Sequence, residues 1–82
     1  MNLQLKQDKF LTELKEFLFF HLGSDAKIKL NFTAGSLNGE VEHQRIRPME
    51  INFTMEEIFS LARDRTRFEN RMLNLLTRYR HS

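Results

Sequence analysis

The sequence predicts an α+β domain in which a helix at each end encloses a small antiparallel sheet. Apolar residues recur at every third or fourth position in residues 3–22 and 54–80, which is the period of a helix. Residues 26–33 instead alternate between apolar and polar, which is the period of a strand. The expected architecture is therefore a helix, two or three antiparallel strands and a long C-terminal helix, with both helices on one face of the sheet. The 82 residues, 40% of them hydrophobic, suit one domain over residues 1–82.

The first helix is expected over residues 3–22. Phe10, Leu14 and Phe17 lie on one stripe of this helix and are candidates for the core. Gly23 follows directly and suits the left-handed conformation that commonly ends a helix.

The first strand should place Ile28, Leu30 and Phe32 on its buried side. A tight turn at Asn38-Gly39 would set Arg45 opposite Phe32 and put a charge on the core face. We therefore expect a bulged or longer loop, which brings Ile46 opposite Phe32 instead. Residues 40–47 then form a polar strand near an edge, Pro48 interrupts the ladder, and residues 49–53 form a short third strand.

The last helix is expected to begin at Thr54 and to continue without a break to Arg80. Thr54 and Glu57 have the spacing of a capping box, in which each side chain accepts a hydrogen bond from the other's backbone N–H. Arg65 interrupts the apolar seam, so it must reach solvent, pair with a carboxylate or lie in a hydrated gap. The seam itself consists of Ile58, Leu61, Arg65, Phe68, Met72, Leu75 and Tyr79, widened by Ala62 and Leu76.

A basic flank on this helix is the main functional lead. Residues 1–62 contain seven Lys or Arg and nine Asp or Glu, a net charge of −2, whereas residues 63–82 contain six and two, a net charge of +4. Guanidinium groups make bidentate contacts to phosphates and carboxylates, so the flank predicts nucleic acid or an acidic protein as partner. A merely solvated helix face is the alternative. The candidate nucleic-acid-binding residues are Arg63, Arg67, Arg71 and Arg78.

Four large apolar residues lie outside the helical stripes and form the second lead. Small domains with such a surplus usually bury it between subunits. We therefore expect a homodimer, and a groove for a different protein is the alternative. The candidate interface residues are Phe19, Phe20, Phe59 and Leu73.

Catalytic and metal chemistry are not indicated. The chain has no cysteine, its three histidines lie on different predicted elements, and no glycine-rich phosphate loop precedes a helix. We expect no enzyme activity, no metal and no cofactor. No apolar run approaches the ~20 residues of a membrane span, and no signal-peptide pattern occurs, so we expect a cytoplasmic protein without membrane contact.

The sequence thus predicts a small non-catalytic regulatory protein, a homodimer that binds nucleic acid through its arginine-rich helix. The alternative is an adaptor or inhibitor that docks on a larger partner. It would use the exposed aromatic residues or the edge of the strand expected at residues 40–47.

Overall fold

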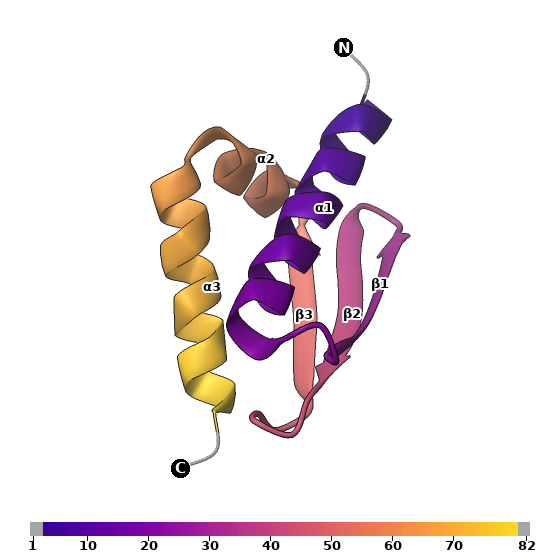
Figure 1. Ribbon diagram of the computed structural model, residues 1–82. Helices are drawn as coiled ribbons and strands as arrows, with labels where there is room; N and C mark the ends of the chain where they lie inside the picture. Colours follow the sequence, from indigo (N-terminus) through magenta and orange to yellow (C-terminus); the bar gives the residue numbers. More distant parts are fainter. Residues whose placement is uncertain (1–2, 81–82) are drawn as a thin grey trace.

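The computed structural model describes the backbone of residues 3–80 and the side chains of residues 7–80. Helices cover one face of a three-stranded antiparallel sheet and leave the other face open, so the predicted α+β class is confirmed (Figure 1). The strand order is β1-β2-β3. In chain order the elements are α1 (Leu3–Leu22), β1 (Lys27–Thr33), β2 (Ser36–Glu42), β3 (Met49–Thr54), α2 (Met55–Arg63) and α3 (Arg65–Tyr79).

The first helix and its end agree with the sequence pattern. Gly23 adopts a φ of +110°, and its N–H donates to the carbonyl of Phe19 at 2.8 Å. This is the left-handed stop that a glycine allows without steric cost. The prediction for residues 3–22 is confirmed.

The hairpin differs from the expectation. Its turn lies at Ala34 and Gly35, both with positive φ, and connects β1 to β2 through two residues. Asn38 and Gly39 lie inside β2 instead of forming a loop. The bulged loop and the strand at residues 40–47 are therefore wrong.

Burial of Leu37 and Val41 explains this register. Both are fully buried on the helix side of β2, opposite Phe32 and Ile28 of β1. Ile46, expected opposite Phe32, lies outside the strands and forms an isolated bridge with Arg80. Because β2 pairs with both neighbours, it is the central strand and offers no edge to a partner.

The C-terminal helix is interrupted at Asp64, so the prediction of one continuous helix is also wrong. Asp64 has extended backbone angles (φ −135°, ψ 100°), and its carboxylate accepts the N–H of Arg67 at 3.2 Å. It thereby ends α2 and caps the start of α3. The capping box at Thr54 is confirmed, since Thr54 Oγ1 accepts the Glu57 N–H and a Glu57 oxygen accepts the Thr54 N–H, both at 3.2 Å.

An aromatic cluster at the centre of the core joins the two layers. The ring of Phe10 from α1 packs edge-on against Phe53 of β3 at 5.8 Å and against Phe68 of α3 at 5.7 Å. Phe17 makes a similar contact with Phe68 at 5.7 Å. These edge-to-face pairs fix α1 over β3 and beside α3.

Candidate functional site

The break at Asp64 divides the predicted arginine row. Arg63 ends α2, whereas Arg67, Arg71 and Arg78 remain on one flank of α3. All four side chains are exposed. Their surroundings differ, so the row is not one uniform surface.

Arg67 and Arg71 are engaged with α2. Arg67 Nη1 donates to Ser60 Oγ at 2.7 Å, and Arg71 Nη2 lies 3.4 Å from Glu57 Oε2. The Arg71 guanidinium also lies 5.7 Å from the centre of the Phe53 ring. Glu56 lines the same shallow hollow as these two arginines, so local carboxylates offset part of their charge. These contacts stabilise the corner between α2 and α3.

Arg65 is the charged residue in the apolar seam, and its side chain turns out of that seam. Its Nε lies 3.1 Å from Glu69 Oε1 and its Nη1 lies 3.9 Å from Glu13 Oε2, while its guanidinium covers the Phe68 ring at 5.2 Å. Two of the expected outcomes are therefore met together, since the Arg65 side chain is 57% exposed to solvent and also pairs with carboxylates.

Arg78 lies at the opposite end of α3, where the loop between β2 and β3 joins the C-terminal segment. The Arg47 N–H donates to the Tyr79 carbonyl at 2.8 Å, and Arg47 Nη2 donates to the carbonyl of Arg78. The Arg47 guanidinium lies 5.7 Å from the Tyr79 ring centre. The Ile46–Arg80 bridge extends this pairing by one residue on each side.

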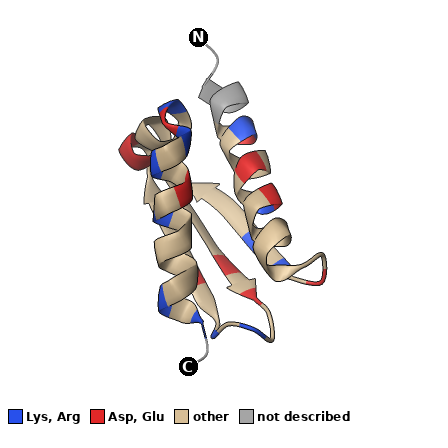
Figure 2. Ribbon diagram, turned by 60° about the vertical axis from the view of Figure 1, so that its left-hand side comes forward, with Lys and Arg blue, Asp and Glu red and all other residues tan. Residues whose placement is uncertain are grey.

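Four arginines from two distant segments therefore gather at one end of the molecule, as Figure 2 shows at the lower end of α3 and in the loop beside it. In the part of the chain that the structure describes, none of them lies within 4 Å of a carboxylate. We call this surface the basic end; it consists of Arg45, Arg47, Arg78 and Arg80.

A buried histidine holds the loop that carries Arg45 and Arg47. The His43 side chain is only 3% exposed; its Nδ1 accepts the Arg45 N–H at 3.1 Å, and its Nε2 lies 3.0 Å from Asp25 Oδ1. Since Nδ1 is an acceptor, the proton of the neutral ring belongs on Nε2, which donates to Asp25. This hydrogen bond, together with the carboxyl's own backbone bond, lowers the pKa of Asp25. Ile46, 4% exposed, anchors the same loop in the core.

Sequence reasoning found only Arg78 of the basic end. The sequence predicts Arg45 and Arg47 in a strand that the structure does not contain, and Arg80 at the end of the helix. Ile46 between two arginines correctly indicates a buried residue with charges on both sides, but the same pattern fits a strand and so does not reveal the loop.

The structure brings together only some of the four residues predicted to form an apolar interface. Phe20, 84% exposed, and Leu73, 43% exposed, line one groove between α1 and α3. Phe19 is 39% exposed and does not line this groove, and Phe59 is half-buried on α2. Two of the four candidates therefore share a surface.

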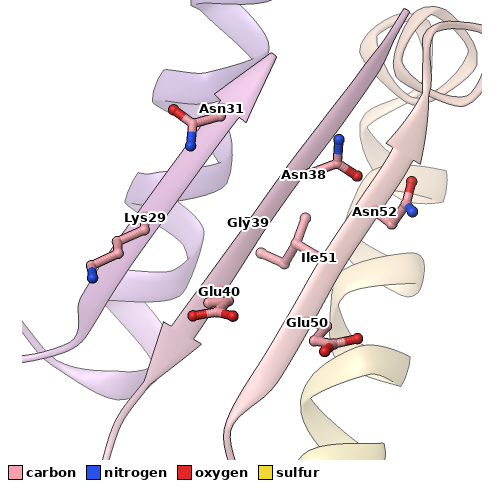
Figure 3. A pocket seen from close by; sticks show the side chains of 8 residues that line it. All are labelled: Lys29, Asn31, Asn38, Gly39, Glu40, Glu50, Ile51 and Asn52. Atoms are coloured by element: carbon pink, nitrogen blue, oxygen red, sulfur yellow. The ribbon is translucent and has the colours of Figure 1, made fainter. Parts of the chain in front are cut away.

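The open face of the sheet is polar throughout. Figure 3 shows its side chains in cross-strand rows, one of which is Asn31, Asn38 and Asn52. Asn38 Nδ2 donates to Thr33 Oγ1 at 2.7 Å and so ties the hairpin at its turn. In the next row Glu40 lies opposite Lys29 of β1 on one side and opposite Glu50 of β3 on the other.

Within residues 7–80, no group of three or more histidine, aspartate or glutamate side chains is placed to hold a metal ion. None of the described helices combines the length and apolar character needed to cross a membrane. Comparisons of the chain with protein-family models, curated proteins and solved structures found no match. The geometry of the surfaces is therefore the basis for a functional assignment.

Proposed function

We propose that this protein is a small non-catalytic regulatory protein of the cytoplasm, a homodimer that binds nucleic acid through the phosphates of its backbone. One observation carries the proposal: four arginines converge at the basic end and none is paired with a carboxylate among the described residues. Guanidinium groups without a carboxylate partner are suited to bidentate phosphate contacts, although Arg47 already uses one donor on the carbonyl of Arg78.

The support is rigid because two backbone segments hold each other. The Arg47–Tyr79 and Ile46–Arg80 contacts fix the loop against the end of α3, so the arginines lose little backbone freedom on binding. Arg67 and Arg71 extend the positive surface along α3, but their contacts with Ser60 and Glu57 already occupy part of their donors. The basic end is therefore the primary phosphate site of the proposal.

Fluorescence anisotropy of short labelled RNA and DNA tests it at low salt. The variant Arg45→Glu/Arg80→Glu should weaken binding by about tenfold or more, because two phosphate contacts become repulsions. The control Lys9→Glu/Lys15→Glu makes the same change in net charge on the exposed side of α1. No binding by the natural protein, or an equal loss in the control, would refute the proposal.

The exposed Phe20 beside Leu73 favours a second function, an adaptor that docks on a protein partner. Glu16, Glu69 and Arg65 line the same groove, and Arg65 already pairs with Glu69, so a positive charge on the partner would meet Glu16 beside the apolar contact. Phe20→Asp should abolish this binding and leave nucleic-acid binding unchanged. An interaction that persists in Phe20→Asp would contradict this assignment.

A further inference from the structure

Strand β1 is an edge of the sheet. It pairs only with β2, and in Figure 1 it lies at the margin of the layer that α1 and α3 cover. Successive backbone groups of a strand point alternately to its two sides, so about half of those in β1 point away from β2. Among the described residues no other strand pairs with them.

The apolar side of β1 is also incompletely covered. Ile28, Leu30 and Phe32 are only half-buried, although they face the same layer as the core residues of β2 and β3. Those core residues are at most 2% exposed; they are Leu37, Val41, Met49, Ile51 and Phe53. Edge backbone and apolar surface are thus left open together on one strand.

Edge strands are usually protected by charged side chains, especially lysine, by proline, by a bulge or by a covering segment. The other edge, β3, has Pro48 directly before it and α3 beside it. The loop that leads into β3 is held against the end of α3 by the hydrogen bond from Arg47 to Tyr79. The seven residues of β1 contain no proline, glycine or bulge. Its two lysines, Lys27 and Lys29, are exposed and are the charges that protect this edge. Figure 3 shows the Lys29 side chain extending on the side of β1 away from β2.

We propose that β1 of a second copy of this chain occupies this edge. The two β1 strands pair antiparallel about a two-fold axis at Leu30, which joins the two three-stranded sheets into one of six strands. The inference rests on the proposed homodimer and assigns its interface to β1, away from the groove at Phe20.

The sequence of β1 selects this register. With the axis at Leu30, all seven residues find a partner, since Leu30 is the middle residue of the strand. Moving the axis to Lys29 or Asn31 leaves five pairs, and the axis at Lys29 sets that lysine against its own copy. Shifting the pairing of the two strands by one residue would place apolar residues opposite polar ones and turn the apolar side of the partner strand to the open face.

The central register is also complementary in side chains. On the helix side, Ile28 lies opposite Phe32 of the partner subunit and Leu30 opposite Leu30 of the partner subunit, so half-exposed apolar groups cover one another. On the open face, Lys29 lies opposite Asn31 of the partner subunit and Lys27 opposite Thr33 of the partner subunit. No like charges lie directly opposite each other, and Lys29 lies on the diagonal from Lys29 of the partner subunit.

Sedimentation velocity over a range of concentrations tests the inference. Asn31→Lys would set a lysine against Lys29 of the partner subunit twice in each dimer, and should weaken association by about 2- to 30-fold. Asn31→Glu should strengthen association, and Lys29→Glu/Asn31→Lys should restore it. Asn52→Lys is the matched control, because Asn52 occupies the same row on β3, two strands away from the β1 edge.

A cross-link provides an independent readout, because the chain contains no cysteine. Only the residue on the axis meets its own copy, so Leu30→Cys should form a disulfide-linked dimer on mild oxidation. Thr33→Cys, on the same strand, should not. A linked dimer from Thr33→Cys and none from Leu30→Cys would overturn the register.

The outcomes separate this inference from the proposed function. A monomer at every concentration would overturn both the homodimer and the β1 interface. A dimer insensitive to Asn31→Lys but lost in Phe20→Asp would keep the homodimer and overturn the β1 interface. Pairing of β1 with an extended peptide of another protein, without self-association, would also overturn it.

Discussion

Gly39 is the position where one added carbon should do the most damage to the sheet. It lies at the middle of β2, opposite Leu30 of β1 and Ile51 of β3. A Cβ there would overlap the backbone carbonyl oxygen of Lys29 and lie 2.6 Å from Leu30 Cδ2. Because the carbonyl belongs to the backbone, Gly39→Ala is accommodated only if β1 moves away from β2.

Overpacking of this kind costs about 1–3 kcal/mol. A domain of this length has a total stability of roughly 4–12 kcal/mol, and each kcal/mol lowers Tm by about 4–8 °C. Gly39→Ala should therefore lower Tm by roughly 5–20 °C in thermal unfolding followed by circular dichroism. An unchanged Tm would refute the close approach of the two strands.

Gly35 is the matched control because its glycine is required for a different reason. It has a φ of +83°, and an added Cβ would meet no atom within 4 Å. Gly35→Ala costs about 1–2 kcal/mol of backbone strain, and Gly35→Asn should recover part of it because asparagine tolerates this conformation. At Gly39, asparagine should be worse than alanine. If asparagine were tolerated better than alanine at both positions, the steric explanation for Gly39 would be contradicted.

Three further predictions concern the core, the break between the helices and the loop of the basic end. Phe10→Ala removes the ring that joins Phe53 and Phe68 and should cost about 3–5 kcal/mol in urea unfolding; a cost below 1 kcal/mol would contradict its central place. Asp64→Ala should cost about 1 kcal/mol through the lost cap of α3, and an unchanged midpoint would refute that role. Because the pKa of Asp25 is lowered in the folded protein, the ionised carboxylate stabilises the fold above the unfolded pKa of about 3.9, and this stabilisation is lost as pH falls through the folded pKa. Asp25→Asn should therefore flatten the fall of unfolding free energy at acidic pH. An unaltered fall at acidic pH would exclude this contribution.

Helix α1, strands β1 and β3 and the cap at Thr54 could be predicted because each has a local signal. The periodic apolar residues of residues 3–22 and the strict alternation of residues 27–33 need no tertiary information. Thr54 and Glu57 likewise form a capping box from their spacing alone.

The hairpin turn could not be predicted because two signals conflicted. Asn38-Gly39 is the stronger turn dipeptide, whereas Ala34 must adopt an unfavourable φ of +36° in the turn that forms. Burial of Leu37 and Val41 outweighs that strain, and this gain exists only once α1 covers the sheet. The dipeptide predicts Gly39 in a turn, whereas in the structure its lack of a side chain admits the neighbouring strand.

The break at Asp64 was missed because the apolar pattern continues through it. Leu61 and Phe68 keep helical spacing across the break, and an aspartate on a helix surface is unremarkable by sequence. Its capping role becomes visible only from its backbone angles. The basic end was missed for a related reason, since it depends on contacts between residues 45–47 and 78–80.

The salt dependence of nucleic-acid affinity tests the central claim most directly. If the four arginines of the basic end contact phosphates of a single strand, log affinity should fall with log salt concentration with a slope of about −3. Arg45→Glu/Arg80→Glu should reduce the steepness of that slope by about half. A slope near zero, or the same slope in this variant and the natural protein, would contradict the assignment of the basic end as a phosphate-binding surface.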